Sequence, residues 1–203
     1  MGISPNGDKE VHFDQSRLIP GLLFGVFQLG LDLIFNTTPS MVRLLLKFQA
    51  DLEGVTDLKP AGENYDWFFE VKCTSCNEKH PKLVTMNRVE EKTVSGGKNS
   101  TAHFVWRCGL CKRESSAKFE PAHPLQPYTA ENSGKLAPLV TVDCRGLEFV
   151  GFDPRGTWTC KGTESGTVFS EVVLDDREWT DYDEKVSAPV GIMEIKSEWV
   201  RAP

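Results

Sequence analysis

Four cysteines stand in two closely spaced pairs. Cys73 and Cys76 lie in EVKCTSCNEK, and Cys108 and Cys111 repeat the same C-x2-C spacing in WRCGLCKRE. A single pair of this kind serves thiol–disulfide exchange and metal binding equally well, so one pair alone does not decide between them. Two pairs supply the four thiolates that a tetrahedral zinc site requires, delivered by two short turns. We therefore predict that these four cysteines bind one Zn²⁺ ion.

The distance between the pairs is the unusual feature of this pattern. Thirty-one residues separate them, whereas the usual double-knuckle pattern has about 15 to 20. The intervening residues form two strand-like stretches, 83–94 and 101–107, around SGGKNS, in which Gly96 and Gly97 suit a hairpin turn. A hairpin can leave the site at one knuckle and return at the other. We therefore expect the two pairs to meet despite their separation.

The residues around the cysteines are basic. Residues 72–113 contain nine Lys or Arg and three Glu, a local charge of +6 in a chain whose net charge is −6. Zinc with four thiolates carries a charge of −2, which nearby cations offset. This basic flank either neutralises the site and binds nothing else or also contacts a partner; it consists of Lys72, Lys79, Lys82, Arg107, Lys112 and Arg113.

The remaining histidines and cysteines are not predicted to bind the metal. His80 could replace a cysteine in a mixed site, but four cysteines already suffice. His103 lies in an aromatic stretch and is expected to pack or to lie on the surface, and His123 lies in a proline-rich connector. We expect Cys144 and Cys160 to behave as small buried hydrophobic residues, and nothing supports a disulfide between them.

No catalytic constellation is evident. Four thiolates leave no coordination position for water, so the predicted zinc is structural rather than catalytic. SGGKNS lacks the spacing of a phosphate-binding loop, and the serines of ESGTVFSE have no suitably placed histidine. We expect a protein that is not an enzyme.

An acidic cluster near the C-terminal end is expected to be a solvated face, although with Trp179 and Tyr182 it would also suit a partner. It comprises Asp175, Asp176, Glu178, Asp181, Asp183 and Glu184.

The composition favours an intracellular protein. Six cysteines in 203 residues are too few for a disulfide scaffold. The N-terminal residues MGISPNGDKEVHFDQ lack the basic start of a secretory signal. An apolar run at residues 18–35 is short for a membrane span and contains Pro20, Gln28 and Asp32. We expect a cytoplasmic, reducing environment, no membrane partner and, given the net acidity, no nucleic-acid partner.

The elements that position the cysteines are expected to be strands. Stretches rich in β-branched and aromatic residues are separated by Gly and Pro signals, at residues 44–52, 67–72, 83–94, 101–107, 139–154, 157–162, 167–174 and 191–200. Residues 120–138 are proline-rich and predict a connector. Residues 175–186 predict a helix or turn, with Thr180 as its cap. Residues 48–60 and 140–154 share a weak common pattern that favours two related β lobes.

Several segments together resemble the eukaryotic CXXC-motif-containing zinc-binding protein family. They are LEGVTDLKPAGENYDWFFEVKCTSCNE, GGKNSTAHFVWRCGLCKRE, VDCRGLEFVGFDP and ESGTVFSEVVLDDREWTDYDEK, spread over residues 41–200. The resemblance implies an all-β fold of two sandwich- or barrel-like lobes, residues 41–127 with the zinc and residues 128–203, packed as one compact unit. It also implies a zinc site of four cysteines near one end and no established enzymatic activity. Residues 1–40 fall outside it, and we expect them to be a poorly ordered extension or a gene-model artefact preceding Met41.

These observations predict a non-catalytic, monomeric zinc-binding protein that presents a surface to another protein. Metal handling is the main alternative: CxxC thiolates also suit Cu(I), so the chain would transfer zinc or copper or act beside a metal chaperone. An enzyme with an unrecognised pocket and a nucleic-acid binder using the basic flank are further alternatives that the residues support less.

Overall fold

The structure is a computed structural model that describes residues 41–95 and 100–203. The predictions made for residues 1–40 and for the turn at Gly96 and Gly97 lie outside these residues. Within the described part of the chain, no helix is long and apolar enough to cross a membrane.

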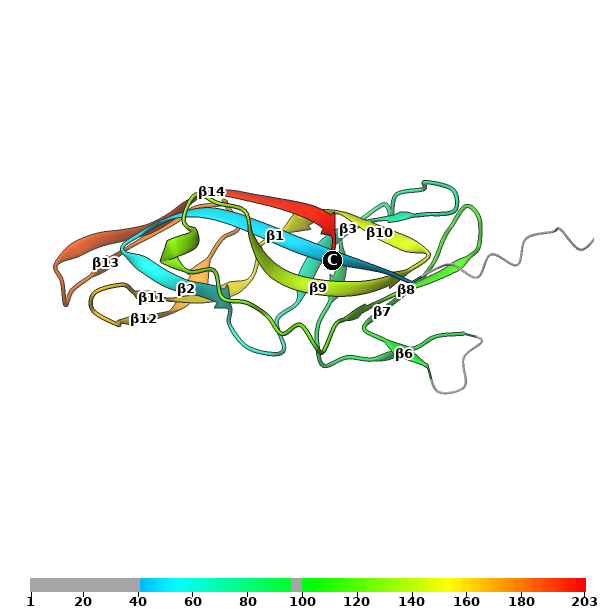
Figure 1. Cartoon of the computed structure of the whole chain (residues 1–203), viewed down its shortest axis with the longest axis horizontal. Helices are drawn as coiled ribbons and strands as arrows, with labels where there is room; N and C mark the ends of the chain where they lie inside the picture. The colour runs from blue at the N-terminus through cyan, green and yellow to red at the C-terminus, as the bar shows by residue number, and fades with distance from the viewer. Residues whose placement is uncertain (1–40, 96–99) are drawn as a thin grey trace, which may run out of the picture. The chain divides into compact units, whose positions relative to one another are not determined.

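Almost all regular structure in the described residues is β-strand, with one short 3-10 helix, η1 Ala130–Asn132 (Figure 1). The strands are β1 Met41–Glu53, β2 Val55–Pro60, β3 Trp67–Cys73, β4 Val84–Met86, β5 Lys92–Thr93, β6 Thr101–Ala102, β7 Phe104–Arg107, β8 Glu114–Phe119, β9 Ala137–Arg145, β10 Leu147–Asp153, β11 Thr157–Gly162, β12 Val168–Val173, β13 Trp179–Asp183 and β14 Ala188–Arg201. The all-β prediction is confirmed.

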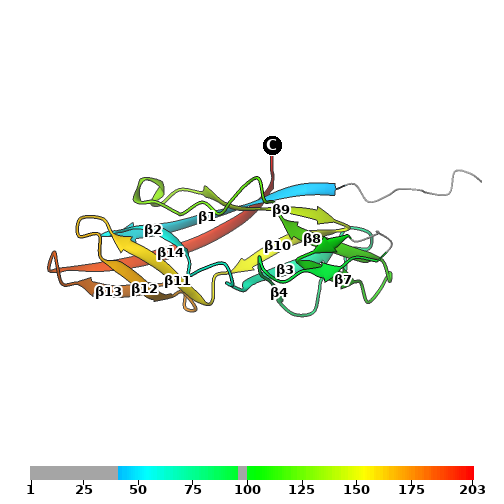
Figure 2. The same ribbon diagram turned by 90° about the horizontal axis from the view of Figure 1, so that it is seen from below.

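These strands form four sheets within the described ranges. The largest has six strands in the order β13-β14-β1-β9-β8-β7, and β1 lies between β14 and β9 as an antiparallel neighbour of both. Two three-stranded sheets have the orders β10-β3-β4 and β12-β11-β2, and β5 pairs with β6. The β10-β3-β4 sheet lies toward the end of the body that carries β7, whereas β12-β11-β2 lies toward the β13 end (Figure 2).

Strand pairing mixes the two halves of the sequence. Strand β1 pairs with both β9 and β14, β2 pairs with β11, and β3 pairs with β10. Each of the three larger sheets therefore takes strands from both residues 41–127 and residues 128–203. The division into two lobes at residue 127 stays a prediction. Backbone hydrogen bonds between strands nevertheless join residues 41–127 to residues 128–203 in each of the three larger sheets.

Alternation along the strands explains how the core forms. In β1 every second side chain is buried, from Leu44 through Leu46 and Phe48 to Ala50. Such alternation is what a strand with one buried face requires. The same period runs through β3, where the buried positions end at Cys73. The pattern that builds the core therefore also points the first cysteine inward.

A cluster of aromatic rings fills the core between the sheets. The ring of Trp67 lies 6.0 Å from Phe69, 5.8 Å from Phe119 and 6.4 Å from Trp158, measured between centroids. Phe48 of β1 stacks on Trp158 at 5.6 Å. Large aromatic side chains bury more area than other residues and dominate such cores. These contacts hold the β10-β3-β4 and β12-β11-β2 sheets against the six-stranded sheet.

The sequence predicts a helix or turn at residues 175–186; the helix is wrong, and turns occur only at residues 175–176 and from 184 onward. This segment contains β13, whose residues pair with β14 from Trp179 opposite Ile192 to Asp183 opposite Ala188. Thr180 therefore sits within a strand and caps no helix. The charged residues of this segment are not typical of a strand, but an edge strand can carry charges on its exposed side. Pairing with β14 then outweighs the local sequence preference.

Two further strand predictions differ from the structure. Residues 83–94 form the short strands β4 and β5 rather than one strand, and β4 pairs with β3. The predicted hairpin is confirmed for β5, which pairs antiparallel with β6, Lys92 opposite Ala102 and Thr93 opposite Thr101. Strand β8 was not expected, although Ser115, Ala117 and Phe119 are buried alternately along it. Small and polar residues on its buried face concealed that alternation.

Candidate metal centre

The first knuckle begins where β3 ends. Cys73 is the last residue of that strand, and its carbonyl oxygen accepts a hydrogen bond from the N–H of Asn77 at 2.9 Å. The N–H of Cys73 donates to the carbonyl oxygen of Glu78, also at 2.9 Å. Asn77 closes the turn with a φ of 61°, in the left-handed region. These bonds bring Cys76 back beside Cys73.

The second knuckle repeats this geometry after β7. The carbonyl oxygen of Cys108 accepts a hydrogen bond from the N–H of Lys112 at 3.1 Å, and the N–H of Cys108 donates to the carbonyl oxygen of Arg113 at 3.0 Å. Lys112 has a φ of 61°, matching Asn77. The two C-x2-C segments therefore form the same turn, closed at equivalent positions.

The two knuckles bring four sulfur atoms together. The Sγ atoms of the four cysteines all lie within 4.8 Å of one another. Cys73 and Cys111 are 3.7 Å apart and Cys76 and Cys108 are 3.5 Å apart, in each case between Sγ atoms. A zinc ion with Zn–S bonds of about 2.3 Å has tetrahedral sulfur–sulfur distances of about 3.8 Å. The donor set and its spacing therefore fit a tetrahedral zinc ion.

Further contacts fix the knuckles to each other and to the body. Arg113 Nη1 donates to Ser75 Oγ at 3.1 Å, which joins the second knuckle to the first. The N–H of Thr74 donates to the carbonyl oxygen of Gly146 at 3.1 Å, and Ser115 Oγ donates to the same oxygen at 2.9 Å. Gly146, which has a φ of 75°, forms the turn between β9 and β10. The first knuckle is thus held by the turn that connects the six-stranded sheet to the β10-β3-β4 sheet.

The pKa values of the clustered thiols show how a cation would affect this site. The N–H groups of Cys111 and Leu110 point to the sulfur of Cys108 and lower the pKa of that thiol to about 7. For Cys76 the N–H of Glu78 also favours the thiolate, but burial and the three neighbouring thiols outweigh it and raise the pKa to about 12. Four thiolates at this spacing repel one another. A divalent cation among them would offset that repulsion.

The three histidines within residues 41–203 that the structure describes lie outside the cluster. His80 Nδ1 is 2.7 Å from the carbonyl oxygen of Lys82, and its ring packs edge-on against Trp106. His103 is buried, and its Nδ1 accepts a hydrogen bond from the N–H of Phe119 at 3.0 Å. His123 is exposed on the connector. None of the three is grouped with the cysteines.

The other two cysteines are buried, as predicted. Cys144 on β9 and Cys160 on β11 are at most 1% exposed and are free thiols. Burial raises the pKa of both thiols, that of Cys160 to about 12. A thiol that stays protonated at neutral pH is a poor nucleophile. Both residues act as small apolar side chains in the core.

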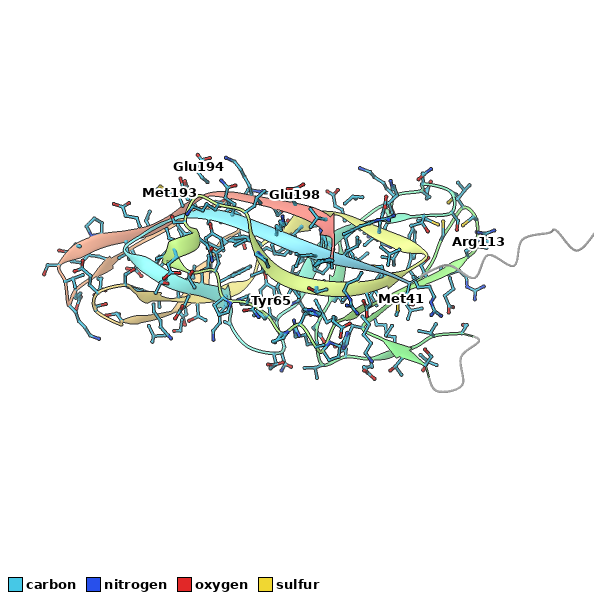
Figure 3. The ribbon with its side chains drawn as sticks, viewed as in Figure 1. Met41, Tyr65, Arg113, Met193, Glu194 and Glu198 are labelled. Carbon is cyan, nitrogen blue, oxygen red and sulfur yellow. The ribbon has the colours of Figure 1, made fainter. Side chains whose placement is uncertain are left out.

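The surface around the cysteine cluster is basic. Lys79, Lys82, Arg107, Lys112 and Arg113 are exposed, whereas Lys72 pairs with Glu148. Leu110, between the second pair of cysteines, is 65% exposed. Figure 3 places Arg113 at the end of the body opposite the β13–β14 hairpin. We call the five exposed cations and Leu110 the zinc-end surface.

The acidic cluster has one exception to the predicted solvated face. Asp183 is 1% exposed and accepts hydrogen bonds from Ser165, from Thr167 Oγ1 at 3.2 Å and from the N–H of Lys185 at 3.1 Å. It therefore connects the turn after β13 to the turn between β11 and β12. The other acidic residues are exposed, as expected: Asp175, Asp176, Glu178, Asp181 and Glu184.

An all-β body with two matching C-x2-C knuckles whose four sulfurs converge defines the class of β-proteins with a four-cysteine metal site. The sequence matches the family described as CXXC motif containing zinc binding protein, eukaryotic, over residues 45–200. The chain belongs to this family, which confirms the resemblance noted in its sequence.

Individual relatives support the assignment. The CXXC motif containing zinc binding protein of Xenopus laevis is 40% identical over 161 residues, which cover 79% of this chain and 99% of the relative. The protein of the same name from Homo sapiens is 37% identical over 161 residues, with the same coverage.

Solved structures share the fold. The crystal structure of C1orf123 superposes with a TM-score of 0.74 at 36% identity, covering 79% of this chain and 99% of that one. A hypothetical protein from Plasmodium falciparum has a TM-score of 0.70 at 22% identity, covering 78% and 99% respectively, which shows the fold alone.

Proposed function

We propose that Cys73, Cys76, Cys108 and Cys111 bind a single Zn²⁺ ion whose role is structural. The convergence of the four Sγ atoms at nearly tetrahedral spacing carries this proposal. Four thiolates complete the coordination sphere of zinc and leave no site for a water molecule or a substrate. Each cysteine thiol loses its proton when it binds zinc, so zinc affinity falls as the pH is lowered.

A zinc ion in this position would connect two sheets. Cys73 ends β3 of the β10-β3-β4 sheet, whereas Cys108 and Cys111 lie between β7 and β8 of the six-stranded sheet. Zinc binding also closes the loop of residues between the two pairs. Closing a loop of this length stabilises the folded state by limiting the freedom of the unfolded chain. The metal therefore fixes one end of the body.

Replacing one ligand tests this role. Cys108→Ser should reduce bound zinc well below one ion per chain and lower the melting temperature, because three thiolates hold zinc less tightly and the buried hydroxyl adds a polar group. Elemental analysis and calorimetry measure both effects. The matched control is Cys144→Ala, which removes a buried thiol outside the cluster and should keep full zinc occupancy. Full occupancy and unchanged melting in Cys108→Ser would refute the structural role.

The protein is proposed to have no catalytic activity. Among the described residues, the three histidines after Met41 make structural contacts or lie on the surface. The two cysteines outside the cluster are buried, with raised pKa values. These observations support a binding role rather than a catalytic one. We extend the proposal to a monomer that acts in the cytoplasm. Assays for hydrolase and thiol-exchange activity with zinc-loaded protein should return background rates.

The zinc-end surface is the proposed contact for another protein. It combines exposed cations with the apolar side chain of Leu110, which is 65% exposed at the tip of a turn that zinc would hold rigid. An acidic partner segment with an apolar side chain matches this surface in charge and in its apolar contact. Leu110→Asp should abolish capture of such a partner while leaving zinc content unchanged, and Val168→Asp is the matched control at an exposed valine on β12. Equal capture by all three proteins would exclude this surface.

Metal handling is the second candidate, and one observation favours it. Cys76 and Cys111 are partly exposed, unlike the fully buried Cys73 and Cys108. An incoming thiol could therefore reach two of the four sulfurs. Loss of zinc to a competing chelator within seconds, or displacement of zinc by one equivalent of Cu(I), would support transfer. Exchange over hours would support the structural site.

A further inference from the structure

A second site lies beneath the proline-rich connector. A cavity of about 280 Å³ opens between the end of β2, the loop that precedes β3, the residue Arg88 after β4 and the connector. Pro124, Leu125 and Pro127 form the connector wall, and Trp67 contributes to the opposite one. No cysteine of the metal cluster lines it. Figure 3 labels Tyr65, which belongs to the loop at its edge.

Arg88 supplies a donor group that the fold does not use. Its guanidinium carbon lies 4.8 Å from the centre of the Phe119 ring, so the group rests on an aromatic face. Its Nη2 atom is buried and has no hydrogen-bond partner among the described residues. Burial lowers the pKa of Arg88, and the carboxylate of Glu63 acts in the opposite direction. Buried guanidinium donors without partners are rare in folded proteins, and a bound ligand is one way to satisfy such a donor.

The charges and walls of the cavity select the chemistry of its ligand. Arg88 and Lys59 carry two positive charges and Glu63 carries one negative charge, so the lining has a net charge of +1. A planar guanidinium matches a carboxylate in geometry, and one negative charge balances the lining better than the two of a phosphate group. Trp67 and Leu125 provide apolar contact for a body attached to that carboxylate. Proline walls are conformationally restricted, so the site is formed before a ligand arrives.

We propose that this Arg88 cavity binds a carboxylate joined to an apolar group. The carboxylate belongs either to a free organic acid or to the C-terminal residue of a peptide, and the two sources share the same chemistry. A cavity of this size accommodates one side chain with its carboxylate rather than a larger cofactor. The site is independent of the zinc-end surface.

Binding of phenylacetate to the full zinc-loaded chain tests the proposal. NMR titration should shift the indole N–H signal of Trp67 and the methyl signals of Leu125 in a saturable manner. Phenylacetamide, which has the same shape without the charge, should bind at least about tenfold more weakly.

A second comparison separates the two sources of the carboxylate. The peptide acetyl-Gly-Phe with a free C-terminus is compared with its amidated form. Tighter binding of the free-acid peptide than of phenylacetate identifies a peptide terminus as the source, and the reverse order identifies a free acid.

Three variants separate the proposed contacts from general effects on the fold. Arg88→Met keeps the length of the side chain but removes the guanidinium, and should weaken phenylacetate binding at least about tenfold. Glu63→Gln removes the opposing charge from an exposed position and should strengthen binding, which keeps the test decisive even if Arg88→Met fails to fold. Arg145→Met, at an exposed arginine outside the cavity, should bind as the unaltered chain does.

Three outcomes would contradict the proposal. One is the absence of saturable shifts at Trp67 with any carboxylate probe. Another is equal binding of phenylacetate and phenylacetamide, because the site would then recognise only the apolar body. Weaker rather than stronger binding by Glu63→Gln would likewise contradict the charge argument.

Discussion

Asn77 and Lys112 occupy equivalent places in the two knuckles, one residue after the second cysteine of each pair. Both have a φ of 61°, which most L-residues avoid. Asparagine tolerates this conformation, whereas a lysine there carries strain of about 1–2 kcal/mol. The second knuckle therefore holds a residue that the local backbone disfavours. The bonds of Cys108 to Lys112 and Arg113 maintain it.

If Lys112 is strained, its substitution should change the free energy of unfolding according to how well the new residue tolerates a positive φ. Lys112→Val should lower the free energy of unfolding by about 1 kcal/mol or more, because a β-branched side chain is poorly accommodated at positive φ. Lys112→Gly should match or exceed the stability of the unaltered chain, since glycine has no Cβ to clash. Thermal melting of the zinc-loaded proteins ranks the three. A valine variant as stable as the glycine variant would show that the turn relaxes in solution.

Asp183 predicts a pH dependence of stability. The Ser165 hydroxyl donates to its carboxylate and lowers its pKa, with Lys185 N–H and Thr167 adding to the effect against burial. A carboxyl whose folded pKa lies below its unfolded value contributes stability above the unfolded pKa, near 3.9, that is lost as the pH falls through the folded pKa. Asp183→Asn should melt at a lower temperature at pH 7 and lose less stability on acidification below about pH 4. Parallel melting curves against pH would contradict this role.

At the scale of elements, Tyr128 fixes the connector to β1. Its buried hydroxyl accepts a hydrogen bond from the N–H of Ala50 at 3.2 Å and lies 3.0 Å from the carbonyl oxygens of Ala50 and Lys135. The N–H of Tyr128 also donates to the carbonyl oxygen of Leu58 in β2 at 2.8 Å. The side chain of Tyr128 thus joins β1 to the loop around η1, and the backbone of the same residue joins the connector to β2.

Tyr128→Phe should lower the free energy of unfolding by about 1–3 kcal/mol, because it leaves buried backbone groups without a partner while preserving the ring. Chemical denaturation measures the change. Tyr182→Phe, at an exposed tyrosine on β13, is the control and should alter stability little. A Tyr128→Phe variant as stable as that control would show that water replaces the hydroxyl.

The sequence predicts some elements of this fold better than others. The alternation of Leu44, Leu46 and Phe48 identifies β1 from local pattern alone, and two C-x2-C motifs suffice to propose the metal ligands. Strand pairing depends on contacts between distant residues, so neither the order of the sheets nor the strand at Trp179 could be derived locally. The Arg88 cavity has no sequence signature, because its walls come from separate segments.

In the molecule as a whole, the aromatic core and the cysteine cluster lie in different parts of the same β body, and the proposed zinc ion would stabilise the second of them. The core around Trp67 and Trp158 packs the sheets together without any metal. The cluster then connects β3 to the β7–β8 segment at one end. On this account, loss of zinc leaves most strands in place and releases the zinc-end surface.

X-ray absorption spectroscopy of the purified chain, combined with elemental analysis, determines whether the four cysteines bind zinc together. We expect one zinc ion per chain with four sulfur neighbours at about 2.3 Å. Protein purified under reducing conditions without chelators that contains no bound metal would contradict this expectation. A zinc ion whose neighbours include nitrogen or oxygen in place of one of the four sulfurs would contradict it as well.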